Sequence, residues 1–138
     1  MRHRVYGKHL GRNKDERTAL FKNLVQALII HGSIETTETK ARAIKGLVDK
    51  IINQAKSKNT QRLLQSFLNS KEIREKLVKE IAPNMKGRNS GYTSVVKLGQ
   101  RKGDNAMLVR MSLLVEESKK MEVKGKPEVV KGKEIKTR

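Results

Sequence analysis

The sequence predicts an α+β fold in two layers, with four helices packed on a small sheet formed by a short strand and a C-terminal hairpin. Three observations support this fold class. Apolar residues recur with a helical period between residues 14 and 83. The period changes to two after Gly91, and glycines separate the two alternating runs that follow. A chain of 138 residues with 36% hydrophobic residues suits one domain with a modest core.

The first helix is predicted from about Lys14 to His31. Asn13 followed by Glu16 is a capping-box pattern, which is typical of a helix start. Gly32 is a favourable residue for ending a helix. Between these signals, the apolar positions fall along one helical face: Leu20, Phe21, Leu24, Val25, Leu28 and Ile29. Residues 33–36 then predict one brief strand around Ile34.

Three further helices are predicted before residue 84. Thr36 or Thr37 can cap the second, in which apolar residues step by three and four up to Ala55, and which ends near Lys58. The third begins at Asn59, and the fourth begins at Ser70. Pro83 is expected to end the fourth helix, because the residue before a proline is disfavoured from helical geometry.

The last predicted elements are two strands joined as a hairpin. Residues 92–98 and 107–115 each alternate with period two, and residues 99–105 between them contain two glycines. A hairpin alone is marginally stable in water, so its apolar face is expected to pack on the helices. The strand around Ile34 can add a third strand, but the sequence does not identify its neighbour.

The chain therefore divides into a basic arm at residues 1–12, one α+β domain at residues 13–117 and a basic tail at residues 118–138. The tail is rich in Lys, Glu, Gly and Pro, a composition typical of disorder-prone termini. No segment approaches the ~20 apolar residues of a transmembrane helix, and no apolar stretch follows the basic N-terminus as in a secretory signal. We expect no membrane partner.

The formal net charge is +18, which points to a polyanionic partner. The bases are unevenly placed. The arm holds four Lys and Arg residues and no acid, and residues 84–103 hold five and no acid. Basic segments around a mixed-charge middle are the electrostatic pattern of a nucleic-acid-binding protein.

Catalytic and metal-binding functions are disfavoured. The chain has no cysteine, and its histidines lie in the arm (His3, His9) and at the end of the first helix (His31). The glycines do not follow the spacing of a phosphate-binding or dinucleotide loop. We expect no catalytic residue, metal site, cofactor or small-molecule substrate. With only four Phe and Tyr residues and no Trp, an aromatic platform for stacking bases is also disfavoured.

Each basic segment has a plain alternative interpretation. The arm is either a solvated terminus or a phosphate-binding segment, and we favour the second. The loop at residues 86–91 is either a connector or a phosphate grip formed by Lys86, Arg88 and exposed backbone amides, and we favour the grip. For the turn at residues 101–104, where Asp104 is expected to bond the local backbone, and for the tail, neither interpretation prevails.

Three blocks of the sequence carry a resemblance to a known family. The blocks are residues 1–20, with Met1-Arg2-His3-Arg4, Gly7, Leu10, Arg12, Arg17, Ala19 and Leu20; residues 31–41, with Thr36, Thr37, Lys40 and Ala41; and residues 88–106, with Gly91-Tyr92-Thr93, Lys97, Arg101 and Gly103-Asp104-Asn105-Ala106. In order and spacing they resemble the bacterial large-subunit ribosomal protein L17 family.

The resemblance implies a non-enzymatic structural component of the large ribosomal subunit, in the cytoplasm. It implies binding to large-subunit ribosomal RNA near the polypeptide exit tunnel, beside other large-subunit ribosomal proteins. Position by position, the implied RNA contacts are Arg2, His3, Arg4, Lys8, Arg12, Arg17, Lys40, Arg88, Lys97, Arg101 and Lys102, to which the loop analysis adds Lys86.

The sequence departs from the family pattern in two places. Many members have a base where this chain has Ser94, and the tail beyond Ser118 lies outside the shared pattern. The rival hypothesis is a free-standing regulatory or chaperone-like nucleic-acid binder acting off the ribosome. The lack of a helix-turn-helix, zinc-finger or aromatic RNA-binding pattern counts against it.

Overall fold

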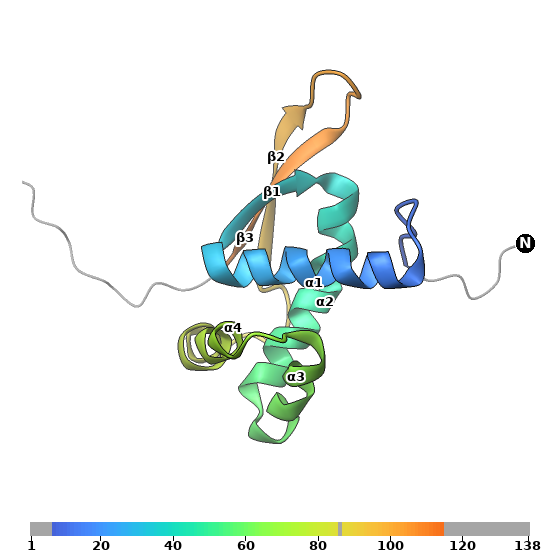
Figure 1. The fold of residues 1–138 in the computed structure, drawn as a ribbon. Helices are drawn as coiled ribbons and strands as arrows, with labels where there is room; N and C mark the ends of the chain where they lie inside the picture. The colour runs from blue at the N-terminus through green and yellow to red at the C-terminus, as the bar shows by residue number, and fades with distance from the viewer. Residues whose placement is uncertain (1–6, 86, 115–138) are drawn as a thin grey trace, which may run out of the picture.

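The structure is a computed structural model, and it describes residues 7–85 and 87–114 of the chain. The predicted α+β fold is confirmed, with helices packed against a three-stranded antiparallel sheet that extends beyond them (Figure 1). In chain order the elements are α1 (Lys14–His31), β1 (Ser33–Thr37), α2 (Glu38–Lys56), a 3₁₀ segment (Lys58–Leu63), α3 (Leu64–Phe67), α4 (Lys71–Lys76), a π turn (Leu77–Ile81), α5 (Ala82–Asn84), β2 (Thr93–Gln100) and β3 (Met107–Leu113). The tail at residues 118–138 lies outside the described residues.

The order of the sheet is β1-β3-β2, and both pairings are antiparallel. In the register, Val109 of β3 lies between Thr36 of β1 and Lys97 of β2. The last strand of the chain is therefore the central one, which answers the question that the sequence left open for the strand around Ile34. The hairpin of β2 and β3 extends beyond the helices (Figure 1).

The bounds of α1 agree with the sequence prediction because local signals set both ends. At the start, the backbone N–H of Asn13 donates to the Glu16 carboxylate at 3.2 Å. At the end, Gly32 takes a left-handed conformation with φ of 74°, and its N–H donates to the carbonyl of Leu28 at 2.9 Å. A side chain at Gly32 would be strained in that conformation.

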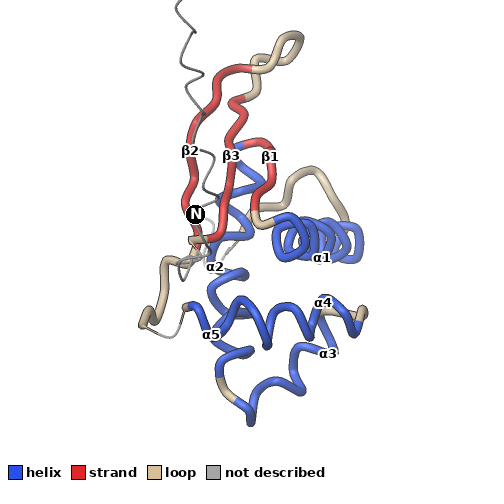
Figure 2. Tube along the Cα trace, turned by 90° about the vertical axis from the view of Figure 1, so that its left-hand side faces the viewer, coloured by secondary structure: helices blue, strands red, loops and turns tan. Residues whose placement is uncertain are grey.

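The core is centred on one face of α2. Its predicted apolar positions are buried: Ala41, Ile44, Val48, Ile51 and Ala55, together with Ile52. They pack in one cluster with α1, with the segment from Leu64 to Met85, and with Tyr92, Val109 and Met111 near and on the sheet. Figure 2 shows α2 running from the sheet down to the shorter helices, and α4 and α5 contact α1 and α2 in turn. The helix α2 therefore joins the two halves of the fold.

Two predictions about the middle of the chain were imprecise. The third helix is mostly a 3₁₀ segment, with only Leu64–Phe67 as α-helix. The fourth does not end before Pro83, because Ala82 keeps helical dihedrals of −61° and −39°. A π turn just before the proline, with an N–H of Ala82 bonded to the carbonyl of Leu77, widens the helix there. Helix distortion of this kind relieves the steric conflict that a proline causes inside a regular helix.

The expectation that the apolar face of the hairpin packs on the helices holds for only part of it. Val109 and Met111 of β3 are buried, but Val95, Val96 and Leu98 of β2 are exposed. The helices contact β2 mainly through α2, and β2 extends past them at the edge of the sheet. The register also shifts between Lys97 and Gly99, which interrupts the alternation of faces.

Candidate nucleic-acid interface

The structure distributes the predicted RNA-contacting residues over several places. Arg2, His3, Arg4 and Lys86 lie outside the described residues. Lys8 and Arg17 line one groove, while Arg12 is exposed just beside it, with its guanidinium bonded to the carbonyl of Leu10 at 2.8 Å. Arg88 lies in the loop before β2. The remaining residues are Lys40, half-buried on α2 and outside the groove, and Lys97, Arg101 and Lys102, exposed on the outer half of the hairpin.

The groove, called the basic groove below, lies between residues 7–9, α1 and the N-terminal half of α2. Its volume is about 790 Å³. The described residues that line it are Gly7, Lys8, His9, Arg17, Phe21, Arg42, Ala43, Gly46, Leu47 and Lys50. Four of these are Lys or Arg, none is acidic, and Phe21 and Leu47 supply half-buried apolar surface. A concave basic surface of this kind concentrates anions.

Arg17 fixes residues 9–12 against the start of α1. One nitrogen of its guanidinium lies 3.3 Å from Nδ1 of His9 and 3.3 Å from the carbonyl oxygen of Arg12, to which it donates. This cation therefore joins the wall formed by residues 7–12 to the first turn of the helix. Its role in the structure is to position the arm as well as to supply charge.

Sequence analysis missed two cations of the basic groove, Arg42 and Lys50. Arg42 is paired with Glu38 at 2.6 Å, although 69% of its side chain is exposed. The signal was available, because Arg42, Gly46 and Lys50 are spaced by four and lie on one face of the predicted helix. What the spacing does not indicate is that residues 7–9 lie across the groove from that face.

The loop before β2 is held to α2 by a polar network. Tyr92 is fully buried, and its hydroxyl lies 2.5 Å from Oδ1 of Asn53 and 2.8 Å from the carbonyl of Arg88. The ammonium of Lys56 donates to that hydroxyl at 2.6 Å and also to the carbonyl of Arg88. It lies 4.4 Å from the centroid of the Tyr92 ring, within cation–π distance.

Asp49, one turn before Asn53 on the same face of α2, completes this network. Its carboxylate accepts the backbone N–H groups of Gly91 and Tyr92 at 3.3 and 3.2 Å. Asn53 in addition donates its amide to the carbonyl of Asn89 at 3.0 Å. The segment from Arg88 to Tyr92 is therefore held by hydrogen bonds at Arg88, Asn89, Gly91 and Tyr92 rather than being a loose connector. Three residues of α2 set the position at which Arg88 leaves the body of the protein.

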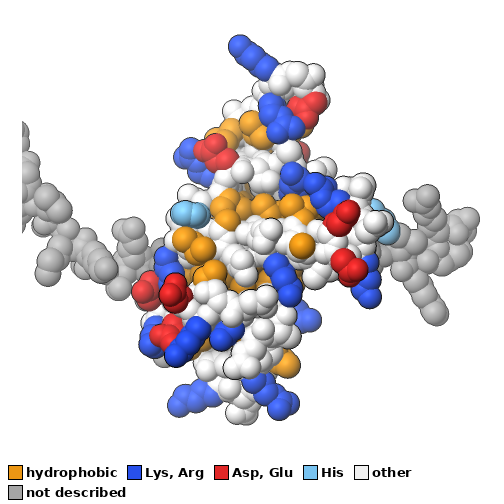
Figure 3. Space-filling view, viewed as in Figure 1, with side chains coloured by type: hydrophobic (Ala, Val, Ile, Leu, Met, Phe, Trp, Pro, Cys, Tyr) orange, Lys and Arg blue, Asp and Glu red, His pale blue; other side chains and the backbone are white. Residues whose placement is uncertain are grey.

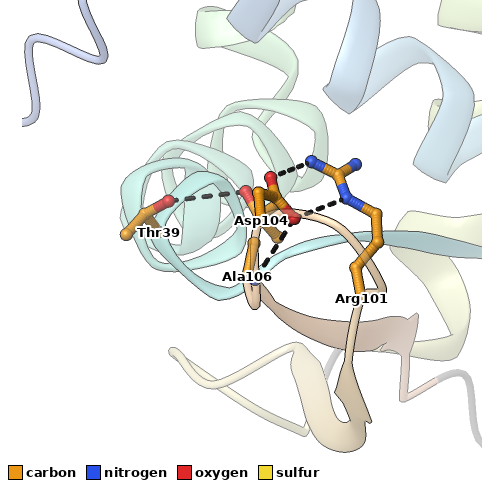
Figure 4. A network of polar contacts seen from close by, with 5 residues as sticks. Thr39, Arg101, Asp104 and Ala106 are labelled. Carbon is orange, nitrogen blue, oxygen red and sulfur yellow. Dashed lines mark hydrogen bonds and ion pairs between the residues drawn. The ribbon is translucent and has the colours of Figure 1, made fainter.

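The turn of the hairpin contains an ion pair. Arg101 donates to both carboxylate oxygens of Asp104, at 2.6 and 3.1 Å, and Asp104 also accepts the N–H of Ala106 at 3.3 Å (Figure 4). These bonds lower the pKa of Asp104 from 3.8 to about 2, with the Arg101 hydrogen bond as the largest cause, and they raise the pKa of Arg101. The expected bond from Asp104 to the local backbone is confirmed. At this turn Lys102 supplies positive charge next to a partly neutralised arginine.

The charged side chains of α4 differ in arrangement from those of the hairpin. Glu75 pairs with Lys79 at 2.8 Å and with Lys71 at 3.9 Å, and the Lys79 bond is the main cause of the lowered pKa of Glu75. Figure 3 shows acids and bases mixed over this part of the surface, and it also shows red side chains beside the blue ones on the hairpin at the top. The surface of α4 is a solvated mixed-charge face.

In the part of the chain that the structure describes, no three or more His, Asp or Glu side chains lie close enough together to hold a metal ion. Within the same residues, none of the helices combines the length and apolarity required to span a bilayer.

Comparisons with a family model and with individual proteins point to the same family. The model of the family described as "Ribosomal protein L17" matches residues 20–114. The chain is similar to the protein named "Large ribosomal subunit protein bL17" of Persephonella marina, with 48% identity over 112 residues, 78% of this chain and 90% of that protein. The chain is also similar to the protein of the same name from Coprothermobacter proteolyticus, with 46% identity over 108 residues, 77% of this chain and 92% of that protein. It is 40% identical to the one from Geobacter metallireducens over 129 residues, 92% of this chain and 72% of that protein.

Proposed function

Because this chain belongs to the ribosomal protein L17 family, we propose that it binds large-subunit ribosomal RNA through phosphate contacts from three basic surfaces. The family is one of structural, non-enzymatic proteins of the large ribosomal subunit. The three surfaces are the arm with the basic groove, the anchored loop around Arg88 and the outer half of the hairpin. The proposed RNA-binding residues are Arg2, His3, Arg4, Lys8, Arg12, Arg17, Lys40, Lys86, Arg88, Lys97, Arg101 and Lys102.

The observation that carries the proposal is the excess of positive charge on surfaces that point away from the core. The net charge is +18, and the exposed cations of the hairpin lie beyond the helices, where they add little to folding. Charged side chains placed at a distance from the hydrophobic core suit a partner that surrounds the domain. Phosphate neutralisation by Lys and Arg supplies affinity that does not depend on the RNA sequence.

The folded domain acts in this proposal as a spacer that holds the three surfaces apart. The helix α2 lines the basic groove with its N-terminal half and anchors the Arg88 loop with its C-terminal half. In the sequence, residues 1–12 and 118–138 add a basic arm and a basic tail on either side of the domain. We place the protein in the cytoplasm, in the large subunit near the polypeptide exit tunnel, beside other ribosomal proteins.

The test is the salt dependence of binding between the full-length protein and large-subunit ribosomal RNA. The slope of log affinity against log salt gives the number of phosphates neutralised, at about 0.7–0.9 for each. The triple variant Lys97→Ala, Arg101→Ala and Lys102→Ala is expected to lower that slope by about 2–3. The matched control removes three exposed cations outside the three surfaces, with Lys58→Ala, Lys71→Ala and Lys79→Ala, and an equal fall in slope there would contradict the assignment of the hairpin.

A further inference from the structure

We propose that the basic groove binds an unpaired segment of RNA, with phosphates on its cations and bases against its apolar floor. The inference rests on the proposed function, which it refines by naming the form of RNA that this one surface takes. It uses only residues that the structure describes.

The charge of the groove selects an anion. Lys8, Arg17, Arg42 and Lys50 reach it from three different segments, and no acidic residue is among its described lining. Arg17 is held in place by its bonds to His9 and to the Arg12 carbonyl, so one phosphate-binding group is already positioned. Lys50 forms no ion pair with any residue in the described ranges, so its charge is available to a ligand there.

The apolar floor distinguishes an unpaired strand from a duplex. Phe21 and Leu47 are half-buried and form part of the lining, between the cations. A duplex presents phosphates and sugars at its surface and keeps its bases stacked inside, so it has no apolar surface to place there. Unpaired nucleotides expose the faces of their bases, which pack on aromatic and apolar side chains.

Gly46 supplies the third argument. It lies in the middle of α2, where glycine is unfavourable, and its backbone is not in the left-handed region that would require glycine. A Cβ built at Gly46 meets no atom within 4 Å, so neither packing nor conformation in the protein itself excludes a side chain. Gly46 lines the groove between Arg42 and Lys50. Its lack of a side chain leaves room for a ligand to approach the helix between two cations.

The volume of the groove agrees with this ligand. At about 790 Å³ it lies within the range of sites that enclose small organic ligands, ~300–1,000 Å³. A site of this size encloses part of a flexible strand, whereas a double helix would have to lie across its rim.

The test measures binding of the full-length protein to two probes, a labelled single-stranded oligouridylate and a blunt RNA duplex with the same number of phosphates. Gly46→Leu fills the groove without changing charge, and we expect it to weaken single-strand binding about tenfold and duplex binding less than twofold. Asn23→Leu adds an apolar side chain at an exposed position of α1 outside the groove, and is expected to leave both affinities unchanged. Far-UV circular dichroism checks that both variants keep their helices.

A second pair of variants tests the role of charge in the groove, because both variants remove one positive charge from the same helix. Lys50→Ala removes a groove cation, and Lys45→Ala removes an exposed lysine of the same helix outside the groove. We expect Lys50→Ala to weaken single-strand binding about fivefold and Lys45→Ala less than twofold.

The outcomes separate this inference from the proposed function. If the wild-type protein binds neither probe nor ribosomal RNA, the proposed function itself is wrong. If it binds RNA but Gly46→Leu behaves like Asn23→Leu, or weakens both probes equally, the groove is not a site for unpaired RNA and the proposed function stands.

Discussion

The anchoring network around Tyr92 makes a quantitative prediction. Tyr92→Phe keeps the buried ring and removes only the hydroxyl, which contacts Asn53, Lys56 and the Arg88 carbonyl within 2.5–2.8 Å. A hydrogen bond between neutral groups contributes about 1 kcal/mol net, and one to a charged group about 1.5–3 kcal/mol. Part of this is recovered, because Lys56 still bonds to the Arg88 carbonyl and Asn53 is exposed to water. We expect the free energy of unfolding to fall by about 2 kcal/mol.

The assay is urea unfolding of the full-length protein, followed by far-UV circular dichroism and analysed by linear extrapolation. In thermal unfolding, a loss of about 2 kcal/mol corresponds to a fall in Tm of roughly 8–16 °C for a domain of this size. The control is Thr18→Val, which removes an exposed hydroxyl bonded to the Lys14 carbonyl at 2.9 Å. A Tyr92→Phe variant within about 0.5 kcal/mol of that control would refute the reasoning that the network stabilises the loop.

Three further predictions concern the helix, the hairpin turn and the sheet. Gly46→Ala replaces a glycine in the interior of α2 with a better helix former, and the added methyl group meets no atom within 4 Å. The free energy of unfolding should rise by about 0.5–1 kcal/mol, measured by urea titration. The ionised carboxylate of Asp104 stabilises the turn at pH values above its ordinary pKa of 3.8, and this stabilisation is lost as the pH falls through the lowered pKa of about 2. A carboxyl NMR titration should therefore show Asp104 ionised at pH 3.5. In the variant Arg101→Ala, the pKa of Asp104 should move back towards 3.8. The pair of Arg110 and Glu35, 2.7 Å apart with both side chains 56% exposed, should contribute less than about 1 kcal/mol in a double-mutant cycle.

The elements that could be predicted from the sequence are those that depend on neighbouring residues. The ends of α1 follow from Asn13, Glu16 and Gly32, each of which acts within its own turn of backbone. The alternation in β3 was equally readable, because its inward side chains meet the core. Local chemistry therefore accounts for most of the α+β outline.

The elements that could not be predicted depend on contacts between distant segments. The 3₁₀ segment and the π turn before Pro83 replace regular helix where short segments pack against α2, α1 and one another. The exposure of Val95 and Val96 reflects how far the helices extend along the sheet, which no period in the sequence encodes.

The same division applies to the candidate interface. Basic segments are visible in the sequence as composition, which identified Lys8 and Arg101, whereas Arg17 was identified through the family resemblance. The joining of residues 7–9 to the face of α2 that bears Arg42 and Lys50 arises only in the folded chain. Likewise, the link between Asp49 and the N–H groups of Gly91 and Tyr92 spans more than forty positions and has no local signal.

The central claim is that this protein is an RNA-bound constituent of the large ribosomal subunit. The most direct test is sucrose-gradient sedimentation of a lysate at native expression level, followed by a wash of the subunit fraction at increasing salt. The account predicts that the protein migrates with the large subunit, stays bound in mild salt and is released over a steep range of salt concentration as its phosphate contacts are lost. Protein that remains at the top of the gradient, or that leaves the subunit in mild salt, would contradict the account and favour a soluble nucleic-acid binder acting off the ribosome.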